Sequence, residues 1–173
     1  MNYTLKLVTK NEIDEVMAII SDAKELLSKD SLQWQQGYPN ETVMMDDILN
    51  NELFGYYLDD FLVGIVALVK GLNKNYTEIY DGSWINPASD NDLTIHRIAV
   101  RKGYYHKKIG DKFIKLSLDY AKEYNLKSIK ADTHIKNIPM QKLLLNNGFE
   151  YRGIIYLKRD EVDNSRLAYE IVL

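Results

Sequence analysis

The hydrophobic positions of this chain follow two periods, one typical of helices and one typical of strands. Apolar side chains recur at intervals of three or four residues in four segments, which predicts helices over residues 10–28, 41–50, 109–124 and 138–147. Shorter alternating or apolar runs predict strands over residues 3–9, 53–58, 61–70, 93–100, 127–132, 149–157 and 166–173. This order of elements predicts one α/β domain with a mixed sheet.

Three segments carry more specific expectations. Residues 61–70 are almost continuously apolar, which predicts a strand covered on both faces. Residues 127–132 alternate polar and apolar side chains, which predicts a strand with one buried face. Residues 71–92 are rich in turn-forming residues, and within them residues 79–85 have a pattern that would allow pairing as a strand.

Composition narrows the classes of function. The chain has 173 residues, a formal net charge of −3, three histidines and no cysteine. Without cysteine there is no disulfide, thiolate metal site or cysteine nucleophile, and the spacing of the histidines does not favour a zinc site. No apolar run reaches the ~20 residues that a membrane helix needs, and the N-terminus lacks a signal-peptide core. We therefore expect a soluble, cytoplasmic protein that binds neither a metal nor a membrane.

The most informative stretch runs from Ile95 to Gly110. A strand pattern there enters a short basic loop, and a helix pattern follows at once. Backbone N–H groups in such a loop and at a helix N-terminus attract phosphate oxygens. The basic side chains of the loop would add diffuse positive charge; they are Arg101, Lys102, Lys107 and Lys108. These features together predict a phosphate-binding loop.

Two stretches together carry a family resemblance. Ile98, Ala99 and Val100 end the strand before the basic loop, and Asn137 is followed eleven residues later by Gly148 and Phe149. In this arrangement the chain resembles the GCN5-related N-acetyltransferases (GNAT). The resemblance implies a central, mixed, mostly antiparallel twisted sheet of six to seven strands, flanked by about four helices, in a single domain over residues 1–173.

The same resemblance implies acetyl-CoA as cosubstrate. Main-chain groups of Ile98, Ala99 and Val100 would pair with the pantetheine arm, and Asn137 would contact that arm. Amides of the loop would hold the pyrophosphate; the loop residues are Tyr105, His106, Lys107, Lys108, Ile109 and Gly110.

The chain departs from the family pattern at three positions. Tyr105 stands where an Arg or Gln is usual, and Lys108 stands where the family has its first loop glycine. A glycine there permits unusual backbone angles, so a lysine must accept the same conformation or enlarge the loop. Leu144 stands where many members carry a Tyr that protonates the leaving thiolate, and the sequence identifies no replacement for it.

His96 is the candidate general base. An ammonium must lose a proton before it attacks a thioester, and an imidazole titrates in the suitable range. Some arylalkylamine acetyltransferases of the family carry a His at the matching position; the alternative is a histidine hydrogen-bonded within the sheet. His134 and Asp132 are further polar candidates near the acceptor cleft, although a loop histidine is the simpler interpretation of His134. Tyr156 is interpreted as a packing residue of the sheet.

The N-terminal half supplies candidates for the acceptor side. Trp34, Tyr38 and Pro39 form either an aromatic lid over the acceptor or a satellite hydrophobic cluster. The acidic residues of the 41–50 helix would either attract a cationic amine or form a solvated face; they are Glu41, Asp46 and Asp47.

The sequence thus favours an N-acetyltransferase that moves an acetyl group to a primary amine of a small molecule or peptide. Without a cysteine or serine nucleophile motif, the transfer is expected by direct attack in a ternary complex. One alternative is a coenzyme-A-binding regulatory module without transferase activity. Another is a nucleic-acid-binding module that uses residues 101–108, which the negative net charge disfavours. Family members often form homodimers, and this chain is compatible with that state.

Overall fold

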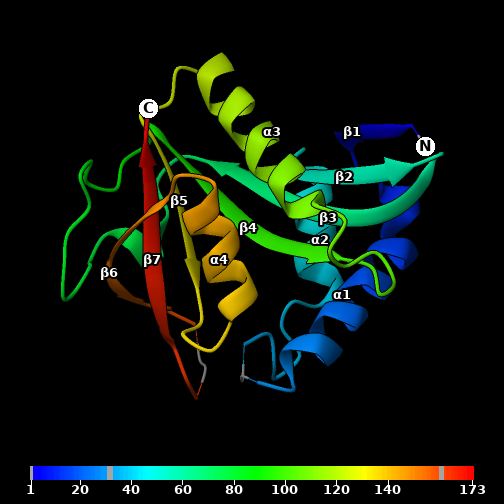
Figure 1. The fold of residues 1–173 in the computed structure, drawn as a ribbon, viewed down its shortest axis with the longest axis horizontal. Coiled ribbons are helices and arrows are strands. Elements are labelled where there is room, and N and C mark those ends of the chain that lie inside the picture. Colours follow the sequence, from blue (N-terminus) through cyan, green and yellow to red (C-terminus); the bar gives the residue numbers. More distant parts are fainter. Residues whose placement is uncertain (1, 31–32, 160–161) are drawn as a thin grey trace. The chain divides into compact units, whose positions relative to one another are not determined.

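The computed structural model describes residues 2–30, 33–159 and 162–173. Within them, seven strands form one mixed sheet in the order β1-β2-β3-β4-β5-β7-β6 (Figure 1). The strands are β1 (Tyr3–Leu7), β2 (Leu53–Leu58), β3 (Phe61–Lys70), β4 (Asp92–Val100), β5 (Ser128–Thr133), β6 (Glu150–Tyr156) and β7 (Ser165–Val172). The α-helices described are α1 (Ile13–Leu27), α2 (Glu41–Leu49), α3 (Ile109–Glu123) and α4 (Ile138–Asn146). The predicted α/β fold class is confirmed.

The chain divides into two compact units. Unit 1 comprises residues 1–68 and 96–113, and unit 2 comprises residues 69–95 and 114–173. β4 and α3 each have residues in both units, so each of these elements is described in two parts.

The core of unit 1 lies between its strands and the helices α1 and α2. Side chains of α1 and α2 pack with alternate residues of β2 and β3, which include Leu53, Ile65 and Ala67. Residues 62–68 of β3 are all buried, which confirms that this strand is covered on both faces. Trp34 is also part of this core and Tyr38 packs against it, so Trp34 is a core residue and not a lid.

Gly64 on β3 allows α3 to begin close to the sheet. A β-carbon at this position would lie 3.2 Å from Ile109 Cγ2, 3.3 Å from the Ala99 carbonyl oxygen and 3.3 Å from the Phe113 ring. These distances are tighter than ordinary van der Waals contacts, so any larger residue would push the first turn of α3 away. Gly64 therefore helps to fix where the helix N-terminus lies.

In unit 2, the expectation of a strand with one buried face over residues 127–132 is wrong. Ser128, Ile129, Lys130 and Ala131 are all buried, and the Lys130 side chain is 0% exposed. The polar face of β5 is covered by residues 74–86, which we call the strap. The alternation that suggested an exposed face instead marks the polar residues that the strap contacts.

The strap is held by hydrogen bonds rather than by strand pairing. Of the predicted strand over residues 79–85, only Tyr80 pairs, through two backbone hydrogen bonds of 2.8 Å with Ile154 of β6. Trp84 is buried, and its indole N–H donates to the Tyr76 carbonyl at 2.9 Å. No helix within the described ranges is long and apolar enough to span a bilayer.

Candidate active site

β4 enters the candidate site with an irregular backbone. Its parallel pairing with β5 runs from Asp92 to Thr94, and Arg97 then adopts φ +49°. A positive φ is uncommon for a residue with a side chain, and it interrupts the regular pleat between His96 and Ile98. His96 and Ile98 are half-buried here, whereas Ala99 is buried. The structure thus places a kink directly before the three residues predicted to pair with the cofactor arm.

Arg97 itself is held by two elements of unit 1. Its Nε and Nη2 atoms donate to the two carboxylate oxygens of Asp47 at 2.6 and 2.8 Å, and Nη1 donates to the Tyr38 hydroxyl at 2.9 Å. Asn40 begins α2 by accepting the Val43 N–H at 3.0 Å, which positions Asp47 on the second turn. Asp47 is only 5% exposed, so the interpretation of this residue as part of a solvated face is wrong.

Burial and pairing act in opposite directions on the pKa of Asp47, and likewise on that of Arg97. Burial raises the pKa of Asp47 from its usual value, and the hydrogen bonds and charge of Arg97 oppose that change. Burial would lower the pKa of Arg97, but Tyr38 and Asp47 outweigh it and raise that pKa. A bidentate contact in a buried site strongly favours the ionised pair, so both side chains are charged at neutral pH.

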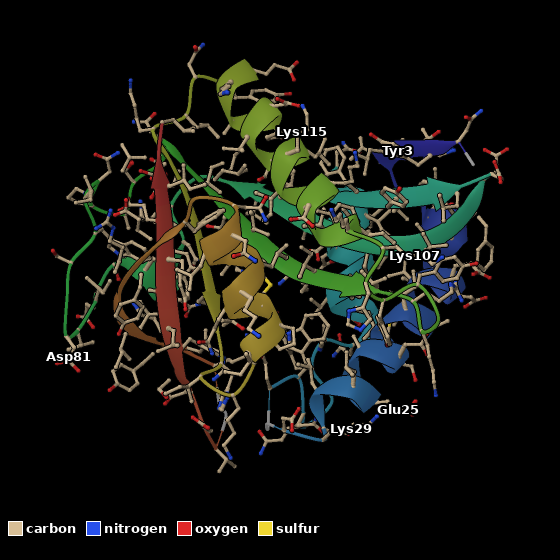
Figure 2. The ribbon with its side chains drawn as sticks, in the orientation of Figure 1. Tyr3, Glu25, Lys29, Asp81, Lys107 and Lys115 are labelled. Atoms are coloured by element: carbon tan, nitrogen blue, oxygen red, sulfur yellow. The ribbon has the colours of Figure 1, made fainter. Side chains whose placement is uncertain are left out.

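The first part of the basic loop is fastened to β3 and α1. The Arg101 N–H donates to the Val63 carbonyl at 2.8 Å, and its guanidinium pairs with Glu15. The Lys102 N–H donates to Asp22 at 2.8 Å. The Lys102 ammonium lies 3.4 Å from a carboxylate oxygen of Glu25, a residue of α1 that is labelled in Figure 2. The prediction that Arg101 and Lys102 add diffuse positive charge is therefore wrong, because α1 supplies a carboxylate for each.

The second part of the loop leads directly into α3. His106 and Lys108 adopt φ +64° and +58°, and Lys107 stands between them. Lys108 thus takes the left-handed conformation that a glycine would adopt easily. The three side chains are exposed. Amides close to one another in a left-handed turn form concavities that bind anions.

The N-terminus of α3 adds further donors at the same place. The Lys112 N–H donates to the Lys108 carbonyl at 3.3 Å, and a helix has no intrahelical partner for the N–H groups that precede such a bond. Ile109 is buried and packs near Gly64, which holds this helix start in place. The residues from Lys107 to Gly110 therefore fit a phosphate group, with two lysine side chains beside the amides.

Tyr105 lies in the same loop and is half-buried. Burial raises the pKa of its hydroxyl, and the nearby carboxylates Asp22 and Glu25 raise it further. The phenol is therefore neutral at physiological pH, and Tyr105 does not supply the charge of the Arg that is usual at this position.

Asn137 and Leu144 lie in unit 2. The Asn137 side chain accepts the Met140 N–H at 3.3 Å and so caps α4. Leu144 is fully buried and carries no exchangeable proton, so it cannot act as an acid. Gly148, at φ +89°, follows the helix in the left-handed conformation typical of a C-terminal glycine, and the buried Phe149 comes next.

The other polar candidates of unit 2 are already engaged. His134 Nδ1 accepts the Lys136 N–H at 3.1 Å, so Nε2 carries the proton and donates to Asp163 at 2.6 Å. With both ring nitrogens used, His134 is not available as a base. Asp132 accepts a hydrogen bond of 2.6 Å from the hydroxyl group of the buried Tyr76.

Tyr156 and a possible metal site remain to be considered. Tyr156 is 45% exposed and makes an edge contact with the Tyr80 ring. Over residues 2–30, 33–159 and 162–173, no three His, Asp or Glu side chains gather as metal ligands would.

Sequence reasoning missed Arg97 and Gly64. A basic residue in the middle of a predicted strand was the one available signal for Arg97, because its partners Asp47 and Tyr38 are distant along the chain. A glycine inside the apolar run of residues 61–70 was the signal for Gly64, since such a glycine marks a close approach.

Comparison with known proteins agrees with this geometry. The model of the acetyltransferase (GNAT) family matches residues 20–149. A GNAT-family acetyltransferase from Streptococcus agalactiae 2603 is 32% identical, with a TM-score of 0.87 over 99% of this chain and 95% of that one. No match was found among curated proteins.

Two more distant structures share the fold. PaiA N-acetyltransferase from Thermoplasma acidophilum, solved with coenzyme A, is 14% identical with a TM-score of 0.72 over the full length of both chains. YncA from Salmonella typhimurium, solved with acetyl-CoA, is 10% identical with a TM-score of 0.70 over 98% of this chain and 93% of that one. The family model and the 32% identical relative together show that this chain belongs to the acetyltransferase (GNAT) family, which confirms the predicted enzyme class and acetyl-CoA as its cosubstrate.

Proposed function

We propose that this protein transfers the acetyl group of acetyl-CoA to a primary amine of a small molecule or peptide, by direct attack in a ternary complex. The observation that carries the proposal is the loop from Tyr105 to Gly110, where two left-handed residues precede the N-terminus of α3. This loop would hold the pyrophosphate through its amides, while main-chain groups of Ile98, Ala99 and Val100 would pair with the pantetheine arm. Asn137 would contact the same arm.

The reaction needs a base and a polarised carbonyl. His96 would take the proton from the ammonium, and the free amine would then attack the thioester carbon. An N–H near Ile98 to Val100 would stabilise the negative charge that develops on the carbonyl oxygen. As the tetrahedral intermediate collapses, the carbon–sulfur bond breaks, coenzyme A leaves as the thiolate, and the acylated nitrogen gives up its second proton to water. Leu144 holds no proton, so the thiolate would be protonated by water.

The cofactor site is tested by titrating the protein with acetyl-CoA in a calorimeter. S-acetylpantetheine, which lacks the pyrophosphate and nucleotide, is the matched ligand. We expect micromolar binding of acetyl-CoA and much weaker binding of S-acetylpantetheine. Equal affinity for the two ligands, or no binding of acetyl-CoA at millimolar concentration, would contradict the proposal.

A pair of variants at Gly110 separates bulk from charge. Gly110→Asp places a negative charge beside the proposed phosphate site, whereas Gly110→Ala adds a methyl group alone. An acidic side chain favours a helix N-terminus, so the aspartate variant should fold as stably as the alanine variant. We expect the dissociation constant for acetyl-CoA to rise at least about tenfold for Gly110→Asp relative to Gly110→Ala, because two nearby negative charges repel.

Turnover is tested with a panel of amines: spermidine, kanamycin, phenethylamine, free amino acids and a short peptide. The chain has no cysteine, so a thiol reagent detects only the coenzyme A released. His96→Ala should lower the rate most at neutral pH and below, while acetyl-CoA affinity stays nearly unchanged. An unaffected rate would make His96 a structural residue.

The buried Leu144 keeps one alternative open, a coenzyme-A-binding regulatory module. Tight acetyl-CoA binding without thiol release across the whole panel would favour it. The single-domain extent over residues 1–173, the cytoplasmic location and a homodimer remain proposals.

A further inference from the structure

We infer that Arg97 is a positioning residue, whose anchored side chain holds the kink of β4 in the shape that the acetyl-CoA site requires. The inference rests on the proposed function, because it concerns the same strand. It adds a residue that sequence reasoning missed, together with the two side chains through which it acts.

The first step of the argument is the backbone conformation. Arg97 adopts φ +49°, which is unfavourable for a residue with a β-carbon and routine only for glycine and, less often, asparagine or aspartate. Such a conformation persists only where surrounding contacts enforce it. His96 and Ile98 flank the position, so any relaxation of Arg97 turns the peptide groups of both neighbours. Those groups adjoin the proposed base and the proposed cofactor-pairing segment.

The second step is the anchor that enforces this conformation. The guanidinium donates three hydrogen bonds of 2.6 to 2.9 Å, two to Asp47 and one to Tyr38. The side chains of Arg97 and Asp47 are 11% and 7% exposed, so water competes weakly for these bonds. A planar group fixed at three of its nitrogens leaves little freedom for the main chain that carries it.

The third step concerns charge. An unpaired arginine next to the proposed site would repel the ammonium group of an incoming amine. Asp47 supplies one full negative charge in a bidentate contact, so the anchor holds the backbone while adding no net charge. Tyr38 extends the anchor into the loop of residues 33–39, on the side where the acceptor was expected.

The test compares Arg97→Gly with Arg97→Ala. Both variants lose the anchor, but glycine adopts the left-handed conformation without strain and alanine does not. We expect the dissociation constant for acetyl-CoA to rise roughly tenfold or more in Arg97→Ala and only about threefold in Arg97→Gly, since small displacements of positioning groups have large effects. The rate of thiol release with the best amine of the panel should fall in the same order. Tyr38→Phe, which removes one of the three bonds, should lower that rate about threefold to fivefold.

The matched control is Asp60, an exposed residue in the β2–β3 turn with φ +66°. Asp60→Gly and Asp60→Ala should differ in melting temperature but bind acetyl-CoA as the parent protein does. Equal affinities for Arg97→Gly and Arg97→Ala would overturn the inference, as would a parental affinity in both. If the parent protein itself binds no acetyl-CoA, the proposed function fails, which is a different result from either of these.

Discussion

Arg97 of β4 and Lys130 of β5 are two largely buried cations on adjacent strands, and the two differ in what their ion pairs hold in place. Each is neutralised by carboxylates from other elements: Arg97 by Asp47, and Lys130 by Asp92 and Glu170. Lys130 sits in a regular rung of the sheet, opposite Thr94 and Glu170. Arg97 sits where the backbone is kinked. We therefore expect Lys130 to govern stability and Arg97 to govern the acetyl-CoA site.

The Lys130 cluster holds the strap to the sheet. The Lys130 ammonium lies 2.8 Å from an Asp92 oxygen, a charge contact whose angle does not make it a hydrogen bond, and 5.2 Å from the centre of the Trp84 ring. Glu170 also accepts the backbone N–H groups of Ile85 and Asn86 at 2.8 and 3.3 Å. The cluster thus joins three strands to the strap, and all of its contacts described here belong to unit 2.

The largest effect is expected from Lys130→Met. It leaves the buried Asp92 carboxylate without its cation, which typically costs about 3–5 kcal/mol of unfolding free energy, whereas Glu170 keeps Arg152 at 3.4 Å. Denaturant unfolding measures this loss, with Lys127→Met, at an exposed lysine just before β5, as control. Adding Asp92→Asn should recover part of the loss because one uncompensated charge disappears. The folded fraction should bind acetyl-CoA with the parental affinity. A large loss of affinity would mean that Lys130, like Arg97, governs the acetyl-CoA site.

The corresponding test for Arg97 of β4 is Asp47→Asn, a variant of its partner on α2. The carboxamide keeps the size of the side chain but removes the charge that compensates Arg97 and one of its acceptor oxygens. We expect the rate of thiol release to fall at least about tenfold, because Arg97 is then left without its compensating charge and its main chain is held less firmly. Asp46→Asn is the matched control, since Asp46 is the exposed neighbour on the same helix. An equal effect of both variants would mean that Asp47 acts only through the general acidity of α2.

Tyr76→Phe tests the strap without changing any charge. The Tyr76 hydroxyl is fully buried and donates to Asp132 at 2.6 Å, and burial and Asp132 both raise its pKa well above the usual value. Removing the donor deprives Asp132 of this one buried hydrogen bond, a loss that typically costs about 1–3 kcal/mol. Tyr80→Phe, in the exposed part of the same strap, should leave the melting temperature unchanged. A matching loss at Tyr80 would show that the strap is held as a whole and not through Asp132.

The contrast between the two cations also shows where sequence reasoning stops. Periodicity placed nearly every helix and strand, because the apolar stripes of α1 and α3 and the buried run of β3 are local signals. The family motif placed the loop at Tyr105 to Gly110. Burial of Lys130 was not predictable from its alternating segment, because Asp92, Trp84 and Glu170 come from other parts of the chain.

The kink at Arg97 was not predictable from the sequence for a related reason. Left-handed conformations are usually anticipated at glycine, yet Arg97, His106 and Lys108 all adopt them here. What permits them is the surrounding structure, which for Arg97 is a carboxylate and a hydroxyl far away in the sequence. Local pattern therefore predicts elements well and predicts enforced backbone angles poorly.

The smallest effect is expected at a pair that is neither fully buried nor part of the proposed site. The hydrogen bond from His134 lowers the pKa of Asp163 below its usual 3.8. The unfolded chain therefore binds this proton more tightly than the folded protein, so the pair's contribution to stability is present above pH 3.8 and is lost as pH falls through the lower folded pKa. Because the Asp163 side chain is 38% exposed, solvent screening limits this contribution to less than about 1 kcal/mol. Asp163→Asn should lower the melting temperature slightly at pH 6 and not at all well below the usual pKa of the group. A difference that persists unchanged in acid would mean that Asp163 acts through shape, like the buried clusters, and not through its charge.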